Sequence, residues 1–335
     1  MQTKDLFAAE TVLKKYADVR SLDRWKRDVY VHASSDTFQT TDRLADGIHT
    51  IVEGEQLIDL YLEIRSGCPL VVMFNGAQDR SKTVNLPAFS GLQAVPGDMA
   101  SRLFINDPTL YLSKEISIGW YAGSKRLLLQ KILPNIIRHV ANVGAAPRMI
   151  FGGGSNGAFA SLYYSSLFAN SLAVASNPQT HPLNYYKSHA MRYASVAFDL
   201  DGLEEARNKL PGFIDCDLSK IYSSGVENCA IYIQNINDAF HLEQHCRPFV
   251  EAQGCGVPNQ VMIKQLSERL LLHVADWGGG HVGPKPDYWR RLLVNLIDAD
   301  ANWKDLFSKQ GRVAEIIMLS VEQTLASRSG SSIEK

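Results

Sequence analysis

The sequence predicts an α/β fold: a mostly parallel sheet with helices on both faces and an inserted cap. From residue 69 onward, apolar strand-like segments alternate with helical segments, which is the pattern of a parallel sheet. The segment PLVVMFNGA at 69–77 is almost continuously apolar, as expected of a strand buried on both faces. The alternation stops at 181–227, a stretch that is long for a simple connection and indicates the cap.

The elements are expected in the following order. An N-terminal extension, 1–45, begins with a surface helix. Strands of alternating, β-branched character are predicted at 28–34, 47–53 and 57–65, and they resemble antiparallel strands. The core, 46–180 and 228–326, holds further strands at 69–77, 115–123, 148–155, 172–180, 228–237 and 270–277, and helices at 127–144, 156–170, 241–253, 288–298 and 313–325. Residues 181–227 are predicted as a helical cap or lid, and 327–335 as a flexible tail.

Composition excludes several classes of function. The chain has 335 residues, 34 Lys and Arg against 35 Asp and Glu, and a net charge of −1, so no global field favours a nucleic acid. No window approaches the roughly 18 consecutive apolar residues of a transmembrane helix, and early charges such as Asp5 and Glu10 disfavour a signal peptide. The five cysteines are widely spaced without a C-x-x-C pair. We therefore expect a soluble, cytoplasmic protein without a disulfide framework.

The strongest motif is G-x-S-x-G at 153–157, placed between a predicted strand and a predicted helix. A nucleophile on a sharp strand-to-helix turn needs small neighbours, because larger side chains would collide there. Ser155 is therefore a candidate nucleophile. The alternative reading is a glycine-rich connection that allows close packing or binds a phosphate at the helix N-terminus.

The residues downstream favour the nucleophile. Asp238 follows the strand at 228–237, and His281 lies on a glycine-rich loop after the strand at 270–277. The order Ser, Asp, His, each at a strand end, is that of a hydrolase triad in which the acid orients the imidazole. Asp238 is the preferred acid. Asp276 is an alternative, although its position five residues before His281 suits a role in orienting the glycine loop better. Glu243, close after Asp238, is a further carboxylate in this region.

Acyl transfer also requires donors for an oxyanion. The N–H of Asn156, directly after the nucleophile, would supply one donor. The N–H of Gly76 or Ala77, after the apolar strand, would supply the other, with Gln78 as an alternative.

Other patterns carry less weight. His241 and His245 are spaced i and i+4, but H-E-x-x-H is not matched, so no metal site is predicted. Some aromatic residues could line a carbohydrate or acyl pocket, although such residues are often core: Trp120, Tyr121, Tyr185 and Tyr186. Gln78 is a further candidate for contact with the substrate.

Together these features resemble the α/β-hydrolase superfamily of serine esterases and acyltransferases over about 69–300. The resemblance implies about eight strands, a serine nucleophile and no obligatory cofactor. The segments FNGA, GWYAG and SNPQT, the last at 176–180, are similar to a bacterial branch associated with surface polysaccharides and glycoprotein export. That branch includes carbohydrate O-acetyltransferases and an accessory secretion protein. The Asn-Gly at 75–76, where many esterases have His-Gly, leaves the substrate open.

Three functions follow. The preferred one is a serine hydrolase that acts on a small-molecule or carbohydrate-linked ester. The first alternative is an O-acyltransferase with the same triad, for which acetyl-CoA would be a co-substrate. The second alternative is a non-catalytic assembly protein that kept the fold. The amphipathic helices at the two ends could pair between subunits of a homo-oligomer.

Overall fold

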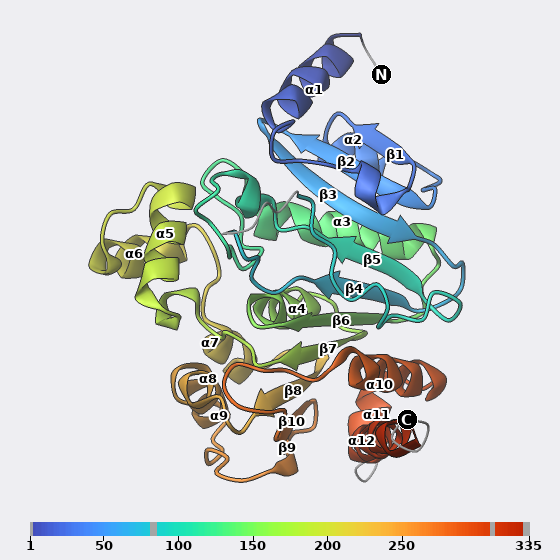
Figure 1. The fold of residues 1–335 in the computed structure, drawn as a ribbon, viewed down its shortest axis with the longest axis vertical. Helices are drawn as coiled ribbons and strands as arrows, with labels where there is room; N and C mark the ends of the chain where they lie inside the picture. The colour runs from blue at the N-terminus through green and yellow to red at the C-terminus, as the bar shows by residue number, and fades with distance from the viewer. Residues whose placement is uncertain (1–2, 81–85, 309–311, 331–335) are drawn as a thin grey trace.

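The computed structural model describes residues 3–80, 86–308 and 312–330, and a ten-stranded sheet forms its centre (Figure 1). The strands lie in the order β1-β2-β3-β5-β4-β6-β7-β8-β10-β9. Their bounds are β1 Val29–His32, β2 Gly47–Glu53, β3 Gln56–Glu63, β4 Leu70–Phe74, β5 Ser101–Ile105, β6 Met149–Gly154, β7 Ser171–Ser176, β8 Cys229–Asn235, β9 Met262–Ser267 and β10 Leu270–Ala275.

The centre of the sheet is parallel, as the sequence predicts. Strands β5, β4, β6, β7, β8 and β10 run in one direction. Antiparallel pairs occur towards the two edges, where β3 pairs with β2 and β5, and β9 pairs with β10. Two expectations are corrected: the sheet has ten strands and not about eight, and β1 pairs with β2 in parallel.

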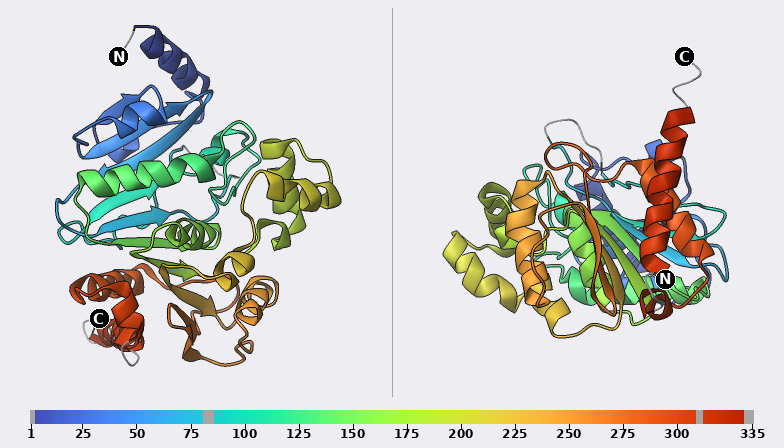
Figure 2. Two further views of the ribbon diagram at one scale, coloured as in Figure 1. Left: turned by 180° about the vertical axis from the view of Figure 1, so that it is seen from behind. Right: turned by 90° about the horizontal axis from the view of Figure 1, so that it is seen from below.

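Helices cover both faces of the sheet (Figure 2). Alternate residues of β4 explain why: Val72 and Phe74 enter the core beneath α3 and α4, whereas Val71 and Met73 enter the core beneath α10 to α12. The helices are α1 Thr3–Lys15, α2 Ser35–Gln39, α3 Leu129–Val143, α4 Asn156–Ser166, α5 Lys187–Phe198, α6 Leu203–Lys209, α7 Leu218–Ser223, α8 Ala239–His241, α9 Arg247–Ala252, α10 Pro286–Asp298, α11 Trp303–Ser308 and α12 Arg312–Gly330. A π-helical turn, Leu242–Cys246, joins α8 to α9.

The predicted strand at 115–123 is wrong. This segment is a buried turn in which Trp120 and Tyr121 have positive φ angles of 53° and 54°. It is held by the carboxylate of Asp107, which accepts the N–H of Tyr121 at 3.0 Å. The strand between β3 and β4 in the sheet is instead β5, which the sequence did not predict. Strand β9 was not predicted either.

The segment 181–227 is helical, with α5, α6 and α7, and lies beside the carboxyl end of the central strands (Figure 1). Its role as a cap stays a prediction. The helix predicted at 313–325 continues as α12 to Gly330, so the predicted tail begins within a helix, and 331–335 lie outside the described residues. None of the helices described is long and apolar enough to cross a membrane.

Candidate active site

Ser155 lies on the sharp turn between β6 and α4. Its torsions are φ 58° and ψ −118°, a region that residues other than glycine rarely occupy. Close packing requires the two glycines of the motif. A Cβ at Gly157 would lie 2.5 Å from the carbonyl oxygen of Phe74, and one at Gly153 would lie 2.4 Å from that of Gly157. The helix thus begins directly against the strand ends and holds the serine at the carboxyl edge of the sheet.

Asp238 and His281 meet from two separate strand ends. Asp238, which follows β8, is 4% exposed, whereas the His281 side chain, after β10, is 39% exposed. The Nδ1 of His281 lies 2.6 Å from Oδ2 of Asp238. Asp276 instead accepts hydrogen bonds from the N–H of Gly278 at 2.9 Å and the side-chain amide of Asn237 at 2.8 Å. The geometry pairs His281 with Asp238 and uses Asp276 to shape the glycine loop.

A second histidine, His241, contacts the same carboxylate. Its Nδ1 lies 3.0 Å from Oδ1 of Asp238, and its ring stacks on His281 with centroids 3.9 Å apart. Burial opposes ionisation of Asp238, but hydrogen bonds from His241 and His281 outweigh it and hold the pKa of Asp238 well below its usual value. Burial lowers the pKa of His241. At pH 7, an ionised carboxylate and a neutral imidazole therefore flank His281.

Two buried asparagines fix the loop that carries the histidine. The side-chain amide of Asn235, the last residue of β8, donates to the carbonyl oxygens of Gly278 and Gly280 at 2.9 and 2.8 Å. Asn177, after β7, donates to the carbonyl of Val282 at 3.0 Å and accepts the N–H of Asn235 at 2.7 Å. The glycine-rich loop is thus tied to two neighbouring strand ends of the sheet.

The hydroxyl of Ser155 is held by Gln179. The Nε2 of Gln179 donates to Oγ of Ser155 at 2.7 Å, and the indole N–H of Trp120 donates to Oε1 of Gln179 at 2.6 Å. Because an indole nitrogen only donates, Trp120 fixes which end of the amide faces the serine. Within the described chain, no hydrogen bond joins Oγ of Ser155 to His281. The serine–histidine step therefore belongs to the proposal below.

The loop after β4 brings Gly76, one of the predicted oxyanion donors, close to the elbow. A Cβ at Gly76 would lie 3.6 Å from the carbonyl oxygen of Gly154, so the two backbones are close. Asn156 is the first residue of α4, and N–H groups in a first helical turn have no partner within the helix. The N–H of Gln78 donates to the carbonyl of Ser117 at 2.9 Å. The alternative donor Gln78 is thus already engaged.

The predicted substrate-contacting aromatics divide into two pairs. Trp120 and Tyr121 are fully buried. The indole N–H of Trp120 donates to Gln179, and the hydroxyl of Tyr121 accepts the N–H of Asn75, so both residues support the site from within the core. Tyr186 is 47% exposed and stacks on Phe240 at 4.0 Å.

The other aromatic, Tyr185, is half-buried and lies 5.9 Å, centroid to centroid, from the ring of His241. Tyr185 and Tyr186 therefore stand on the histidine side of the site. The side chain of Gln78 donates to the carbonyl of Gly76 at 3.0 Å, which braces the loop after β4.

The one metal-capable cluster among the described residues is Asp238, His241 and His281, whose ligand atoms lie within 4.8 Å of one another. Both Nδ1 atoms already lie within hydrogen-bonding distance of the carboxylate, so the cluster coincides with the acid–base pair, and we assign it no separate metal site. His245 is buried and its ring lies 5.3 Å from that of His241. Glu243 pairs with Arg247 at 2.8 Å, away from the triad candidates.

Sequence reasoning missed Gln179, Asn235 and the role of His241. Gln179 lies near the end of the strand predicted at 172–180, and Asn235 lies near the end of the strand predicted at 228–237, so the signal available was a polar side chain close to a strand end. His241 follows Asp238 by three residues, which places it on the same helical turn.

Comparison with known proteins finds no family model and no curated protein that matches the chain. Solved structures with a similar fold are found. The capsule O-acetyltransferase of Neisseria meningitidis serogroup A superposes with a TM-score of 0.51 and 11% identity over 77% of this chain and 97% of that one. An acylaminoacyl peptidase, in complex with Z-Gly-Gly-Phe-chloromethyl ketone, superposes with a TM-score of 0.50 and 13% identity. The match covers 81% of this chain and 43% of the peptidase chain.

A chain of the glycosylation-associated Gap123 complex of Streptococcus agalactiae superposes with a TM-score of 0.50 and 14% identity. The match covers 69% of the present chain and 42% of the Gap123 chain. At such identities these likenesses concern the fold alone. The chain therefore has a hydrolase-like α/β fold, similar to that of proteins with the α/β-hydrolase architecture.

Proposed function

We propose that the chain is a serine hydrolase that cleaves an ester through an acyl-enzyme on Ser155. The observation that carries this proposal is a strained serine turn at the same edge of the sheet as a histidine–carboxylate pair: Ser155 follows β6, and His281 lies 2.6 Å from the buried, ionised Asp238. A strained serine costs stability, and such strain gathers at functional sites. The peptidase among the similar structures is consistent with this class of chemistry.

The proposed mechanism uses each group once in each half-reaction. Oγ of Ser155 attacks the ester carbonyl while its proton passes to Nε2 of His281. The N–H groups of Asn156 and of Gly76 or Ala77 stabilise the oxyanion. His281 then returns the proton to the departing alkoxide, and the C–O ester bond breaks. Water, deprotonated by the same imidazole, releases the acid and restores the serine.

The surroundings of His281 suit this role. Its Nδ1–H donates to Asp238, which selects the tautomer whose Nε2 is free to accept a proton. The ionised carboxylate stabilises the imidazolium formed during attack. Because the neutral ring of His241 stacks on His281, no second positive charge opposes that protonation.

Acyl transfer to a sugar hydroxyl is the alternative, with acetyl-CoA as one candidate donor. It is favoured by the likeness to a capsule O-acetyltransferase, 97% of whose chain is covered. The same triad would serve, with the sugar hydroxyl in place of water. A carbohydrate substrate, a cytoplasmic location and a homo-oligomer stay predictions.

Labelling with a fluorophosphonate probe tests the proposal. We expect wild type to label, Ser155→Ala and His281→Ala to lose labelling, and Ser66→Ala, a change at an exposed serine, to label as wild type. Turnover of p-nitrophenyl acetate, with and without sugar acceptors, then separates hydrolysis from transfer. A folded wild-type protein that stays unlabelled would refute the proposal in favour of a non-catalytic assembly protein.

A further inference from the structure

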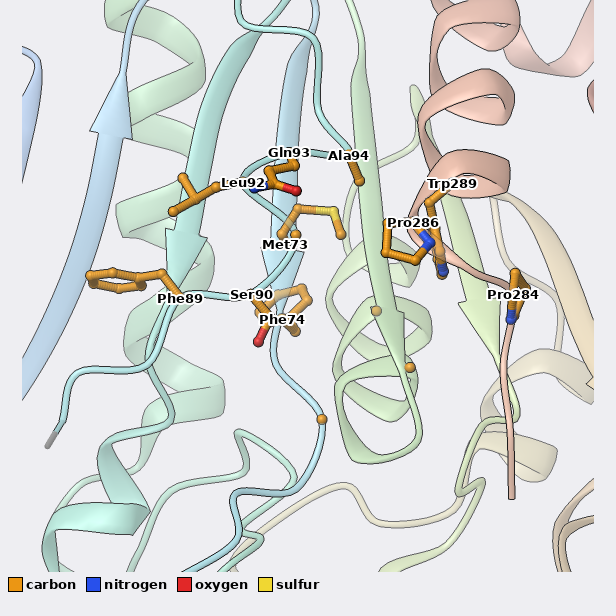
Figure 3. Close-up of a pocket in the computed structure, with 14 residues that line it drawn as sticks. Met73, Phe74, Phe89, Ser90, Leu92, Gln93, Ala94, Pro284, Pro286 and Trp289 are labelled. Atoms are coloured by element: carbon orange, nitrogen blue, oxygen red, sulfur yellow. The ribbon is translucent and has the colours of Figure 1, made fainter. Parts of the chain in front are cut away.

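A cavity of about 470 Å³ lies on the face of the sheet that α10 covers. Figure 3 shows its walls: the segment 89–94 on one side, Pro284, Pro286 and Trp289 on the other, and Met73 between them. Gly152 allows Met73 to lie against the sheet, since a Cβ there would be 2.6 Å from its Sδ atom. The side chain of Met73, which lies over the backbone of β6 at Gly152, therefore forms the floor of the cavity.

The cavity is built for an uncharged, apolar group. Among the described residues that line it, none is ionisable. Its apolar walls come from Met73, Phe89, Leu92, Ala94, Pro286 and Trp289. Ser90 and Gln93 line it with exposed side chains. Pockets of about 300–1,000 Å³ with such walls bury most of a small ligand.

The cavity adjoins the proposed catalytic machinery. Gly76, from the oxyanion loop, and Gly154, directly before the nucleophile, both line it. Pro284, three residues after His281, also lines it. A group attached to the carbonyl carbon at Ser155 can therefore enter the cavity without crossing another element.

The acyl side of the ester fits the cavity better than the alcohol side. The leaving oxygen must lie beside the imidazole of His281, which gives it a proton. His281 does not line the cavity, and its ring stacks on His241, near the aromatic residues Tyr185 and Phe240. The cavity instead starts at the oxyanion loop, on the acyl side of the carbonyl.

We propose that this cavity binds the acyl group of the substrate, and that the group is apolar and longer than acetyl, of about six to ten carbon atoms or an equivalent aryl-alkyl group. An acetyl group would leave most of 470 Å³ without contacts. The inference rests on the proposed function and names its substrate class.

The test is a series of p-nitrophenyl esters from acetate to octanoate, together with acetates of larger alcohols. For wild type we expect kcat/KM to rise about three- to fourfold per methylene up to hexanoate or octanoate. Ser90→Phe, which fills the cavity from an exposed position, should lower the octanoate-to-acetate ratio at least tenfold. Ser66→Phe, on an exposed turn outside the cavity, is the matched control and should leave the ratio unchanged. Trp289→Ala should shift the optimum to longer chains.

Fluorophosphonate labelling of Ser155 keeps the two proposals separate. If Ser155 labels but kcat/KM falls or stays flat with acyl length, the cavity is not the acyl site, and the proposed function still stands. A rise only with the length of the alcohol would assign the cavity to the leaving group and overturn the inference. If Ser155 neither labels nor turns over any ester, the proposed function fails, and the acyl site fails with it.

Discussion

At the scale of single residues, the amide of Gln179 is the contact that the triad pattern does not explain. Gln179 is fully buried, and a buried amide requires partners for both ends. Trp120 satisfies the oxygen, so the nitrogen is committed to Oγ of Ser155. The serine oxygen thus accepts a hydrogen bond and keeps its own proton for a base. In the proposed mechanism Oγ gains negative charge as its proton passes to His281, and that hydrogen bond then strengthens.

We therefore expect Gln179→Ala to lower kcat about 10- to 100-fold with little change in KM, because hydrogen bonds to charged groups contribute about 1.5–3 kcal/mol. Gln179→Glu keeps the size but presents oxygen to the serine, so its loss should be larger. Trp120→Phe leaves the amide free to turn and should fall between wild type and Gln179→Ala. Steady-state kinetics on one ester measures all three variants. A kcat for Gln179→Ala within twofold of wild type would contradict this role.

The sequence predicts the candidate triad residues better than their supporting contacts. Ser155 and His281 stand among glycines, and Asp238 follows a strand, so their positions are marked locally in the chain. Gln179 lies near a strand end and His241 lies three residues after Asp238, but nothing local indicates which groups the two side chains contact. Their roles depend on Trp120, which lies 59 residues before Gln179, and on His281, which lies 40 residues after His241. Contacts of that separation exist only in the folded chain.

At the scale of elements, hydrophobic pattern predicts buried strands but not every buried turn. The apolar run at 69–77 contains β4, as expected. The run at 115–123 is also largely apolar, yet it folds as a turn because Asp107 accepts the N–H of Tyr121 and Gly123 approaches the carbonyl of Leu127. A Cβ at Gly123 would lie 2.2 Å from that oxygen. The apolar pattern at 115–123 therefore predicts that the segment is buried, but it does not predict whether the backbone forms a strand or a turn.

Strand β8 supports the histidine loop through its last residue, Asn235. We expect Asn235→Ala to lower the free energy of unfolding by about 1–3 kcal/mol, because the carbonyls of Gly278 and Gly280 lose their donor. The fluorophosphonate labelling rate should fall as well, since His281 is less well positioned. Urea unfolding and labelling kinetics measure the two effects.

Asn170→Ala is the control for this experiment. Asn170 is an exposed asparagine whose amide also donates to a backbone carbonyl, that of Pro147, at 2.9 Å. It lies far from the histidine loop in sequence and should leave the labelling rate unchanged. Equal labelling rates for Asn235→Ala and wild type would show that β8 does not position the histidine.

At the scale of the whole molecule, the sheet brings the site together from distant parts of the chain. The proposed oxyanion loop, the elbow, Asp238 and His281 follow β4, β6, β8 and β10, and the register of these parallel strands aligns their carboxyl ends. Cores on both faces hold that register. The geometry of the site therefore depends on the stability of the entire sheet.

That stability should depend on pH through buried histidines. Burial lowers the pKa of His32 to about 4, that of His273 to about 4 and that of His245 to about 3. In the unfolded chain these groups titrate near 6.5. Between these values the unfolded state binds more protons than the native state, so the free energy of unfolding falls as the pH decreases from 6.5 to 4. Each histidine contributes up to about 3 kcal/mol to that fall.

Urea unfolding at pH 7.5, 6, 5 and 4 measures this loss, and His273→Gln tests its origin. His273 is buried in β10 beside the hydroxyl of Tyr288. Glutamine keeps a polar group there but does not titrate. We expect the variant to be less stable than wild type at pH 7.5 and the difference to shrink towards pH 4, because wild type alone loses the contribution of the neutral imidazole. Parallel curves for the two proteins would show that protonation of His273 does not couple to folding.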